Sequence, residues 1–523
     1  MSPGLHAPAE QGGVLFDPSP EHVVELLDRA KSFDLPYFQF LDLSFKEWRD
    51  LARKSARLIS SQCHAAVGES FKDIPSANSA GPWIMAGHQP GLAHPGVWLK
   101  NFVLAELAAR HSAFSLNLIV DNDTLKNRSI KVPVWPGPHS PCASVRAQTV
   151  PFDEGVAEVP FEEATVREQQ TFREFAEHVS ELTKDWPEQP IATDFWREVL
   201  SVNSPLIGER IATARRAFEV RMGHSNPEIS VSRSCCSWAF GMYMAAILLD
   251  LPRFHAIHNR SVHAFRKAHG VRSRNHPVPD LASDSEWYEA PFWIWRRGSN
   301  QRMRLFVKPS KDHVELFMDS DPVGTLSAKR FGEEWMVLQK SGIKIRPRAL
   351  TLTLFARLAL ADLFIHGIGG GIYDQLTDEI SRQFFGAAPP PYMVVTGTLR
   401  LPLTIDPPLT KVAPLRDLQW KPQRYAVATD GAAELVAERQ RLIANVPMTR
   451  RGRRERYHAL RENRERLLPF VTQPLTEARK AEADAAARAR ANAILGSREY
   501  SFVLHSERAL REFFENAVSR ITS

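Results

Sequence analysis

Residues 83–96 have the sequence WIMAGHQPGLAHPG, and this stretch decides the fold class of the chain. Its first four residues are apolar, as in a short buried strand, and the glycine- and proline-rich turn after them ends that strand. From Pro95 onward, apolar residues recur at helical spacing, and residues 116–120 (LNLIV) are typical of a second buried strand. Strand, turn, helix and strand in this order predict a βαβ unit.

The same order of elements recurs far downstream. Residues 362–365 (DLFI) are strand-like, the turn HGIGGG follows at 366–371, residues 373–385 have a helical pattern, and residues 392–395 (YMVV) are strand-like again. Strands that alternate with helices predict an α/β fold with a mostly parallel sheet, covered by helices on both faces. Ligands of such sheets bind beyond the carboxyl ends of the strands, so we expect both glycine-rich turns at the ligand-binding edge.

Four segments are expected along the chain. In residues 431–498, Ala, Arg, Glu and Leu are abundant, and Pro469 and Pro474 separate two helical stretches at 430–466 and 474–495, which predicts an antiparallel helical hairpin. The four segments are an N-terminal helical lead-in at 1–80, an α/β core at 81–430, the helical hairpin at 431–498 and a C-terminal segment at 499–523 that packs on the core.

The composition excludes several classes of protein. A chain of 523 residues that is 43% hydrophobic and 24% charged matches globular proteins of more than one domain, and not disordered or fibrous ones. The apolar runs at 238–249 and 350–372 are too short or too interrupted by charges to span a membrane, and residues 1–14 lack a secretory pattern. The four cysteines form no CxxC pair, which argues against a disulfide framework or a cysteine zinc site. We expect a cytoplasmic protein without a membrane partner.

The charge pattern bears on macromolecular partners. A net charge of +6 is a small excess for this length. The basic run RRGRRER at 450–456 belongs to a region in which acids are interleaved with the bases. That pattern favours a solvated helix surface over an arm that binds RNA or DNA. We therefore expect no nucleic-acid partner, and the candidate partner of the hairpin is a second copy of the chain, in a homodimer through apolar seams.

The first turn carries the strongest chemical signal. Glycines let backbone N–H groups approach a phosphate, a helix N-terminus favours negative charge, and a histidine there can donate a hydrogen bond to an oxygen on which charge develops. We therefore predict that His88 and His94 are catalytic. The alternative is a tight turn in which the histidines only cap a helix. The residues of this turn that we assign to substrate or nucleotide binding are Gly87, Gln89 and Gly91.

The second strand ends in Asp121, Asn122 and Asp123, which place two carboxylates and an amide at the same edge. They could bind an amine, a metal-bound nucleotide or a sugar hydroxyl, and the alternative is an Asx turn with a helix cap. We assign the two aspartates to catalysis and Asn122 to binding. The downstream turn is permissive enough to wrap a ligand. Its predicted binding residues are His366, Gly367, Gly369, Gly370, Gly371, Tyr373 and Asp374.

A cluster of histidines lies in the middle of the chain, and its first two members have the HxxH spacing that can bind a metal from one helical face. Many arginines and lysines surround them, and cations oppose a metal. We therefore predict no metal, and a basic wall that binds a carboxylate or a phosphate. The histidines are His255, His258, His263, His269 and His276.

The order of these features resembles the cysteine-adding enzyme family of bacillithiol biosynthesis. Residues 87–92 (GHQPGL) are similar to the first strand-turn-helix of that family. Residues 120–123 (VDND) stand where the family usually has Glu-Asp-His-Asp, so the first acid and the histidine are missing. Residues 345–347 (IRP) and 369–373 (GGGIY) are similar to its Arg-Pro and Gly-Gly-Pro segments, without the loop proline and the glutamate after it.

The resemblance covers roughly residues 80–130 and 340–500. It implies a Rossmann-like core, a C-terminal coiled coil, and a C–N bond-forming ligase or related transferase that joins cysteine or a similar amino acid to an amino-sugar acceptor such as glucosaminyl malate. His88 and His94 would then stabilise phosphoryl or acyl charge, and Asp121 or Asp123 would hold the attacking amine.

The second glycine turn would fix the other substrate, and the candidate cofactor is ATP or another nucleotide. The altered acidic motif keeps two alternatives open. One is a relative with a different substrate, and the other is a non-catalytic protein that binds a nucleotide or a sugar phosphate.

Overall fold

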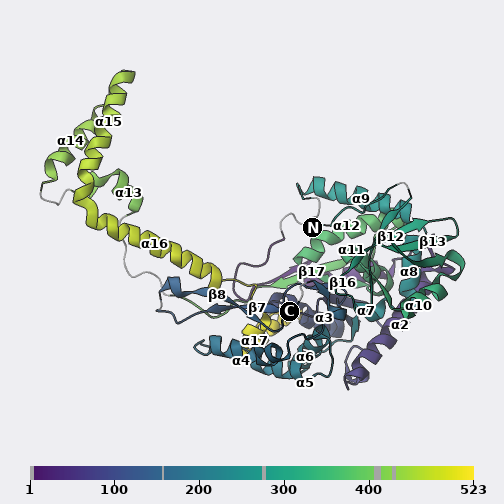
Figure 1. Ribbon diagram of the computed structural model, residues 1–523. Coiled ribbons are helices and arrows are strands. Elements are labelled where there is room, and N and C mark those ends of the chain that lie inside the picture. The colour runs from purple at the N-terminus through teal and green to yellow at the C-terminus, as the bar shows by residue number, and fades with distance from the viewer. Residues whose placement is uncertain are drawn as a thin grey trace.

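A six-stranded sheet forms the centre of the computed structural model, with the strand order β1-β17-β16-β4-β5-β10 (Figure 1). Neighbouring strands are parallel throughout, except that β1 pairs with β17 in the antiparallel sense. The chain is therefore an α/β protein with a mixed, mostly parallel sheet, as predicted. The strands are β1 (Val14–Asp17), β4 (Trp83–His88), β5 (Phe114–Ile119), β10 (Glu228–Ser230), β16 (Leu363–His366) and β17 (Tyr392–Gly397). The structure describes residues 5–139, 141–155, 158–273, 278–284, 286–405, 414–426 and 431–522.

The two faces of the sheet belong to two separate hydrophobic cores. In β4, Ile84 and Ala86 enter one core, whereas Trp83 and Met85 enter the other, because successive side chains of a strand point to opposite faces. The helices of the first core are α1 (Val23–Lys31), α3 (Pro95–Arg110), α4 (Gln169–Thr183), α5 (Ala192–Ser201), α6 (Ile207–Arg221) and α17 (Glu507–Thr522). Those of the second are α2 (Phe45–Ala66), α8 (Trp238–Leu248), α9 (Leu251–Ala268), α10 (Phe331–Lys340), α11 (Ala349–Phe355) and α12 (Ile368–Phe384).

Both predicted βαβ units are present, as β4-α3-β5 and β16-α12-β17. The second differs in one respect, because α12 already begins at Ile368 and Gly369 to Gly371 form its first turn instead of a loop before it. The backbone N–H groups of Gly369 and Gly370 belong to the first turn of α12, where N–H groups have no hydrogen-bond partner within the helix. Tertiary contact also fixes this turn, since the carbonyl oxygen of Gly371 accepts a hydrogen bond of 2.9 Å from the Tyr392 hydroxyl.

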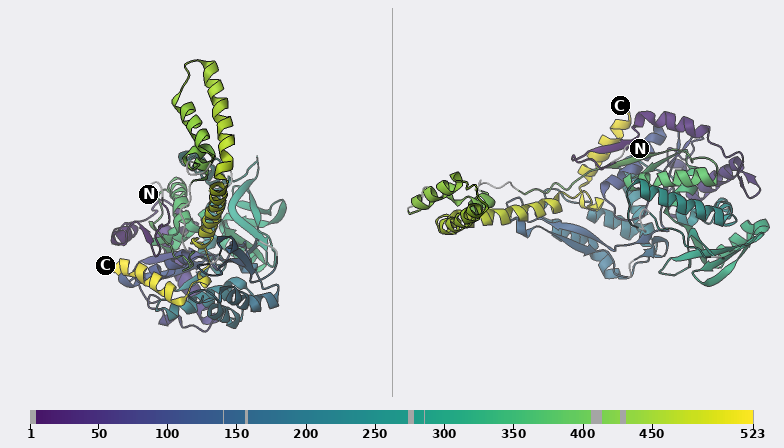
Figure 2. Two further views of the ribbon diagram at one scale, coloured as in Figure 1. Left: turned by 90° about the vertical axis from the view of Figure 1, so that its left-hand side faces the viewer. Right: turned by 90° about the horizontal axis from the view of Figure 1, so that it is seen from above.

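A second sheet, which the sequence pattern does not predict, packs beside the core. It is antiparallel, with the strand order β14-β13-β12-β11-β15 (Figure 2). Its apolar side chains join the core that contains α8 and α10. Arg346 and Pro347, which carry part of the family resemblance, lie on its edge strand β15. The strands are β11 (Tyr288–Arg296), β12 (Met303–Pro309), β13 (His313–Met318), β14 (Asp321–Ser327) and β15 (Ile343–Pro347).

A helical arm projects from the core, as Figures 1 and 2 show. Helix α14 (Ala433–Ala444) runs antiparallel to α15 (Arg450–Leu467), since Asn463 donates to Leu435 O and Arg456 donates to Leu442 O. A hairpin is therefore present, but its turn lies at residues 445–449 and not between Pro469 and Pro474.

The two prolines do not fold the chain back because both occupy helix starts. Pro469 lies in the 3₁₀ segment Leu468–Val471, and Pro474 lies in the first turn of α16 (Thr472–Leu495), where no intrahelical N–H bond is lost. Helix α16 consequently continues from α15 toward the core, and α13 (Leu415–Trp420) packs along it. Within the described part of the chain, no helix has both the length and the apolar character needed to cross a membrane.

Candidate functional site

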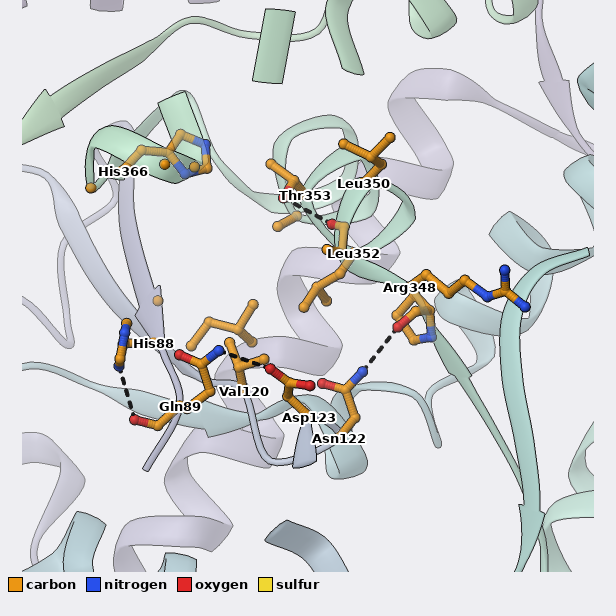
Figure 3. Close-up of a pocket in the computed structure, with 18 of the residues that line it drawn as sticks. His88, Gln89, Val120, Asn122, Asp123, Arg348, Leu350, Leu352, Thr353 and His366 are labelled. Atoms are coloured by element: carbon orange, nitrogen blue, oxygen red, sulfur yellow. Dashed lines mark hydrogen bonds between the residues drawn. The ribbon is translucent and has the colours of Figure 1, made fainter. Parts of the chain in front are cut away.

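A cavity of about 650 Å³ lies at the carboxyl edge of the parallel sheet (Figure 3). Strand β4 has β5 on one side and β16 on the other. The first βαβ unit therefore extends the sheet from β4 toward β5 and β10, whereas the downstream unit extends it the other way, through β16 and β17. Such a switch in direction is where open α/β sheets bind their ligands. The polar residues that line the cavity are His88, Gln89, His94, Lys100, Asn122, Asp123, His258, Arg302, Arg348, Thr351, Thr353, His366, Thr396 and Arg498.

The structure brings most of the predicted site residues to this one cavity. Those that line it are Gly87, His88, Gln89, His94, Asn122, Asp123, His366, Gly367, Gly369 and Gly370. Those that do not are Gly91, Asp121, Gly371, Tyr373 and Asp374. The two glycine-rich turns, which are far apart in the sequence, therefore line the same cavity. Of the predicted site residues that follow β5, Asn122 and Asp123 line this cavity and Asp121 does not.

Asp121 belongs to a different cavity, of about 590 Å³. The chain turns sharply after β5, since the Asp121 N–H donates to Ile119 O, and the Asp121 carboxylate accepts hydrogen bonds from the backbone and the hydroxyl of Ser232. Burial, followed by repulsion from Glu162, raises the pKa of Asp121 to about 7. The structure thus separates Asp121 from the histidines with which the sequence groups it.

Asp123 lines the first cavity, but both of its oxygens already have partners. Oδ2 accepts a hydrogen bond of 2.9 Å from Gln89 Nε2, and Oδ1 accepts from Thr124 N and lies 3.2 Å from Arg302 Nη1 (Figure 3). Asn122 is similarly held, with its amide nitrogen donating to Pro347 O at 2.9 Å. Asp123 thus ties its own turn to Gln89 of the first glycine-rich turn and to Arg302, which does not favour the predicted role in holding an amine.

His88 is a neutral hydrogen-bond acceptor. Its Nδ1 donates to Gln89 O at 3.1 Å, because a carbonyl oxygen can only accept, and Nε2 of the neutral ring therefore has a free lone pair. Burial, together with the positive charge of Lys100, lowers the pKa of His88 to about 3. His88 can accept a proton or a hydrogen bond from a ligand, and it cannot donate one from Nε2 while the ring is neutral.

His94 has the opposite tautomer. As the N-cap of α3, its Nδ1 accepts the N–H of Gly96 at 3.1 Å, so the proton of the neutral ring sits on Nε2. Burial lowers the pKa of His94 to about 4, although the nearby Glu499 opposes this effect. Nε2 lies 3.3 Å from Arg498 Nη2, which can also only donate, so an anionic oxygen bound between the two groups would accept a hydrogen bond from each.

Gly96 allows this turn to approach the neighbouring strand. A Cβ atom at Gly96 would lie 2.2 Å from Gly397 O on β17, which is far inside van der Waals contact. The glycine thus lets the first turn of α3, and with it His94, lie directly against the end of β17.

Four cations that were not predicted as site residues complete the cavity. Lys100 is buried, and its Nζ donates to Gly87 O at 2.9 Å. Arg302 and Arg348 lie on Trp293, with Cζ 4.8 Å and 4.3 Å from the ring centre. Arg498 donates to the hydroxyls of Thr396 and Thr398.

A sequence signal exists for two of these cations. Lys100 follows Gly96 by four residues, which places it on the same face of α3 as the turn, and Arg348 directly follows the Arg346-Pro347 segment. Arg302 and Arg498 are contributed by segments whose positions only the tertiary structure determines.

The electrostatic balance of the cavity is positive. Asp123 is the sole carboxylate among the described residues that line it, and Arg302 neutralises that charge. Lys100 makes no ion pair with any residue that the structure describes, and burial lowers its pKa to about 8, so it remains mostly protonated at neutral pH. The N-termini of α3 and α12 add their partial positive charge. The cavity is therefore suited to an anion such as a carboxylate or a phosphate.

The central histidines do not assemble into a metal-binding group. His255 Nε2 donates to Leu281 O at 2.8 Å, and His258, which reaches the cavity, has its Nδ1 3.2 Å from the side-chain oxygen of Asn259. Over the described ranges, no three histidine, cysteine or acidic side chains are arranged to hold a metal ion. His276 lies outside the described residues.

The basic residues near these histidines are not part of the cavity lining. Arg253 pairs with Asp250 and Arg266 pairs with Asp280, and only His258 of α9 lines the cavity. Among the described residues, the basic wall predicted for this region thus contributes to the surface and to the packing of α9, and the cations that line the cavity come from other elements.

A search of protein-family models finds no match to this sequence, and a search of curated proteins finds none either.

Proposed function

We propose that the protein is a C–N bond-forming ligase or related transferase that binds an acidic small-molecule substrate in the cavity at the carboxyl edge of the sheet. The carboxyl of cysteine or a similar amino acid would be joined to an amino-sugar acceptor, as the family resemblance implies. A Rossmann-like classification of the core is part of this proposal, supported by the switch in strand direction at β4.

One observation carries the proposal. Two turns that resemble segments of the ligase family converge on one positively charged cavity with Lys100, which has no ion-pair partner among the residues that the structure describes. A carboxylate or phosphate entering it would gain an ammonium group, the helix N-termini and the Nε2–H of His94. A purely structural turn would not need a buried lysine without a carboxylate partner, because burying an unpaired charge is costly.

The neighbouring histidines suit acyl or phosphoryl transfer. His94 would donate to the oxygen on which negative charge develops, and Lys100 would neutralise the same group. His88 would accept a hydrogen bond from a hydroxyl or amine of the substrate, because its free nitrogen has no proton. ATP or another nucleotide remains the candidate source of activation, with its phosphates at the helix N-termini.

Product formation tests the proposal. The purified chain is incubated with cysteine and glucosaminyl malate, with and without ATP, and the condensed product is measured by mass spectrometry. We expect product with the unaltered chain, a loss of at least 100-fold in kcat/KM for Lys100→Met and for His94→Phe, and no change for Lys131→Met on the exposed side of strand β7 (Ser129–Val134). No product with any amino acid and amino sugar tested would reject the ligase proposal.

A binding assay separates the alternative. If the chain makes no product but nucleotides or sugar phosphates raise its Tm, and Lys100→Met removes that shift, the non-catalytic binding protein is the better description. A ligand at 100 times its Kd stabilises a protein by about 2.7 kcal/mol, which is easily measured. If neither product nor a shift in Tm is seen, both functions fail.

For the arm we propose a homodimer. Its far end exposes apolar side chains, among them Val446, Met448 and Tyr457, which are 62%, 89% and 63% exposed. The charged residues along α15 instead pair with one another, as Arg451 does with Glu455 and Arg461 with Glu465. This leaves the apolar end as the favoured contact for a second copy of the chain.

A further inference from the structure

His366 and Asp374 form a hydrogen-bonded pair at the edge of the cavity. His366 ends β16 and lines the cavity, across from Asn122 and Asp123 in Figure 3. Its Nε2 lies 2.9 Å from Asp374 Oδ2, and both side chains are buried. The sequence places both residues in a binding turn, but the geometry gives them a more specific relationship.

The pair fixes the tautomer of His366. The Asp374 carboxylate accepts the hydrogen bond, so Nε2 carries a proton and Nδ1 of the neutral ring has a lone pair. Nδ1 has no hydrogen-bond partner among the residues that the structure describes, and the side chain lines the cavity. His366 thus contributes an unprotonated nitrogen to the lining of the same cavity as Lys100 and His94.

Gly370 keeps the space beside this nitrogen open. A Cβ atom at Gly370 would lie 2.7 Å from His366 Nδ1, whereas a Cβ atom at Gly369 or Gly367 would meet no atom within 4 Å. Of these three glycines, only Gly370 is therefore required by its surroundings. The missing side chain of Gly370 leaves space for a ligand atom to approach Nδ1 of His366.

Asp374 is itself held in place. Arg357, from the π-helical segment Ala356–Leu360, donates to Asp374 Oδ2 at 2.6 Å and to Pro390 O at 2.8 Å. Burial opposes ionisation of Asp374, but the charges of Arg357 and His366 outweigh it and hold the pKa of this carboxyl below its usual value. A histidine backed by a fixed carboxylate is the arrangement that proteins use to orient a general base.

We propose that His366 is the general base of the cavity and that Asp374 is the residue that positions it. The inference rests on the proposed function. The amine nitrogen of the acceptor forms the new bond to the carbonyl carbon of an acyl phosphate, its proton moves to His366 Nδ1, and the bond to the phosphate leaving group breaks with its electron pair. The imidazolium then lies against the Asp374 carboxylate and returns the proton to water.

Chemical modification tests the open nitrogen without any activity assay. The full chain is treated with diethyl pyrocarbonate, and modification of each histidine is measured by mass spectrometry, with the exposed His263 as internal reference. We expect His366 to react in the unaltered chain and in Gly369→Ala, and to react at least tenfold more slowly in Gly370→Ala. Equal rates in the two alanine variants, or no reaction in the unaltered chain, would overturn the inference.

Kinetics test the role of the pair. Asp374→Asn keeps an oxygen that can accept from Nε2 but removes the charge that stabilises the imidazolium, so we expect kcat to fall 10- to 100-fold with KM changed less than threefold. His366→Gln should lower kcat by 100-fold or more. If the unaltered chain turns over and both variants keep kcat within twofold, the inference fails while the ligase proposal stands. If no substrate is turned over, the proposed function fails, and the modification rates still decide whether Nδ1 is an open base.

Discussion

The ammonium group of Lys100 lies 2.9 Å from the carbonyl oxygen of Gly87, one turn into the helix that follows the first glycine-rich turn. No carboxylate in the described structure pairs with it, and the residue is buried. The lysine therefore joins the strand end to the helix and presents a positive charge to the cavity, and the binding of anions should depend on that charge.

Sulfate binding should report the charge of Lys100. Sulfate stays dianionic between pH 7 and 9, whereas burial lowers the pKa of Lys100 to about 8, so the lysine loses its proton over this interval. We expect the affinity for sulfate, measured by calorimetry, to fall about tenfold from pH 7 to pH 9. Lys100→Met should bind sulfate weakly at both values. An affinity that is unchanged by the substitution would show that the anion binds elsewhere.

Buried histidines should make the protein less stable in acid. Burial lowers the pKa of His505 to about 3, against an ordinary value of 6.5 in the unfolded chain. The unfolded state thus binds the proton first, and stability that is present above pH 6.5 is lost as the pH falls toward 3, by about 2 kcal/mol per histidine at pH 5. His88, His94 and His258 act in the same direction.

The substitution His505→Phe isolates this effect, because neither ring nitrogen of His505 has a hydrogen-bond partner in the described structure. Urea unfolding at pH 7.5 and pH 5 should show a loss of stability that is about 2 kcal/mol smaller than in the unaltered chain. His313→Phe, at a half-exposed position, is the matched control and should keep the full pH dependence. A variant at 505 with unchanged pH dependence would contradict the explanation.

The ion pair between Glu162 and Arg346 should be essential for stability. Glu162 accepts hydrogen bonds from Arg346 Nε at 2.8 Å and Nη2 at 3.0 Å, and it also pairs with Lys344. Glu162→Gln leaves buried cations without a compensating charge, so we expect a loss of about 3–5 kcal/mol in the free energy of unfolding. Glu455→Gln breaks the exposed pair with Arg451 and should change stability by less than about 0.5 kcal/mol. Equal effects of the two substitutions would argue against a structural role for the buried pair.

The apolar end of the arm should determine the oligomeric state. Size-exclusion chromatography with light scattering should give the mass of two chains for the unaltered protein. It should give the mass of one chain for the triple variant Val446→Asp, Met448→Asp, Tyr457→Asp. Charges introduced at an apolar contact repel one another and must be desolvated, so they prevent association. The same three changes should leave sulfate binding intact, since the cavity is formed by the core. A monomeric unaltered protein would reject the homodimer.

Local patterns in the sequence predict the framework of the core. The apolar residues 83–86 and the glycine-rich turn after them define β4 and its end, and the helical spacing from Pro95 defines α3. The same holds for β16, α12 and β17, with a shift of the helix start into the glycines. Because parallel strands end at one edge, the meeting of the two turns also follows from the sequence.

Other features of the site depend on contacts between distant segments. Arg302 reaches the cavity from the connection between β11 and β12, and Arg498 from the segment after α16; no periodicity of these segments indicates this. Asp121 and Asp123 are two residues apart, yet a tight turn directs them into different cavities.

The sequence by itself determined the alternation of strands and helices, the sheet edge at which the cavity lies, and the turns at 87–96 and 366–371, because these depend on side-chain spacing and on glycine within a few residues. Only the tertiary structure decided which charges face the cavity and which tautomer each histidine adopts. Those properties arise from burial and from partners such as Gly96 for His94 and Asp374 for His366, whose geometry exists only when the chain is folded.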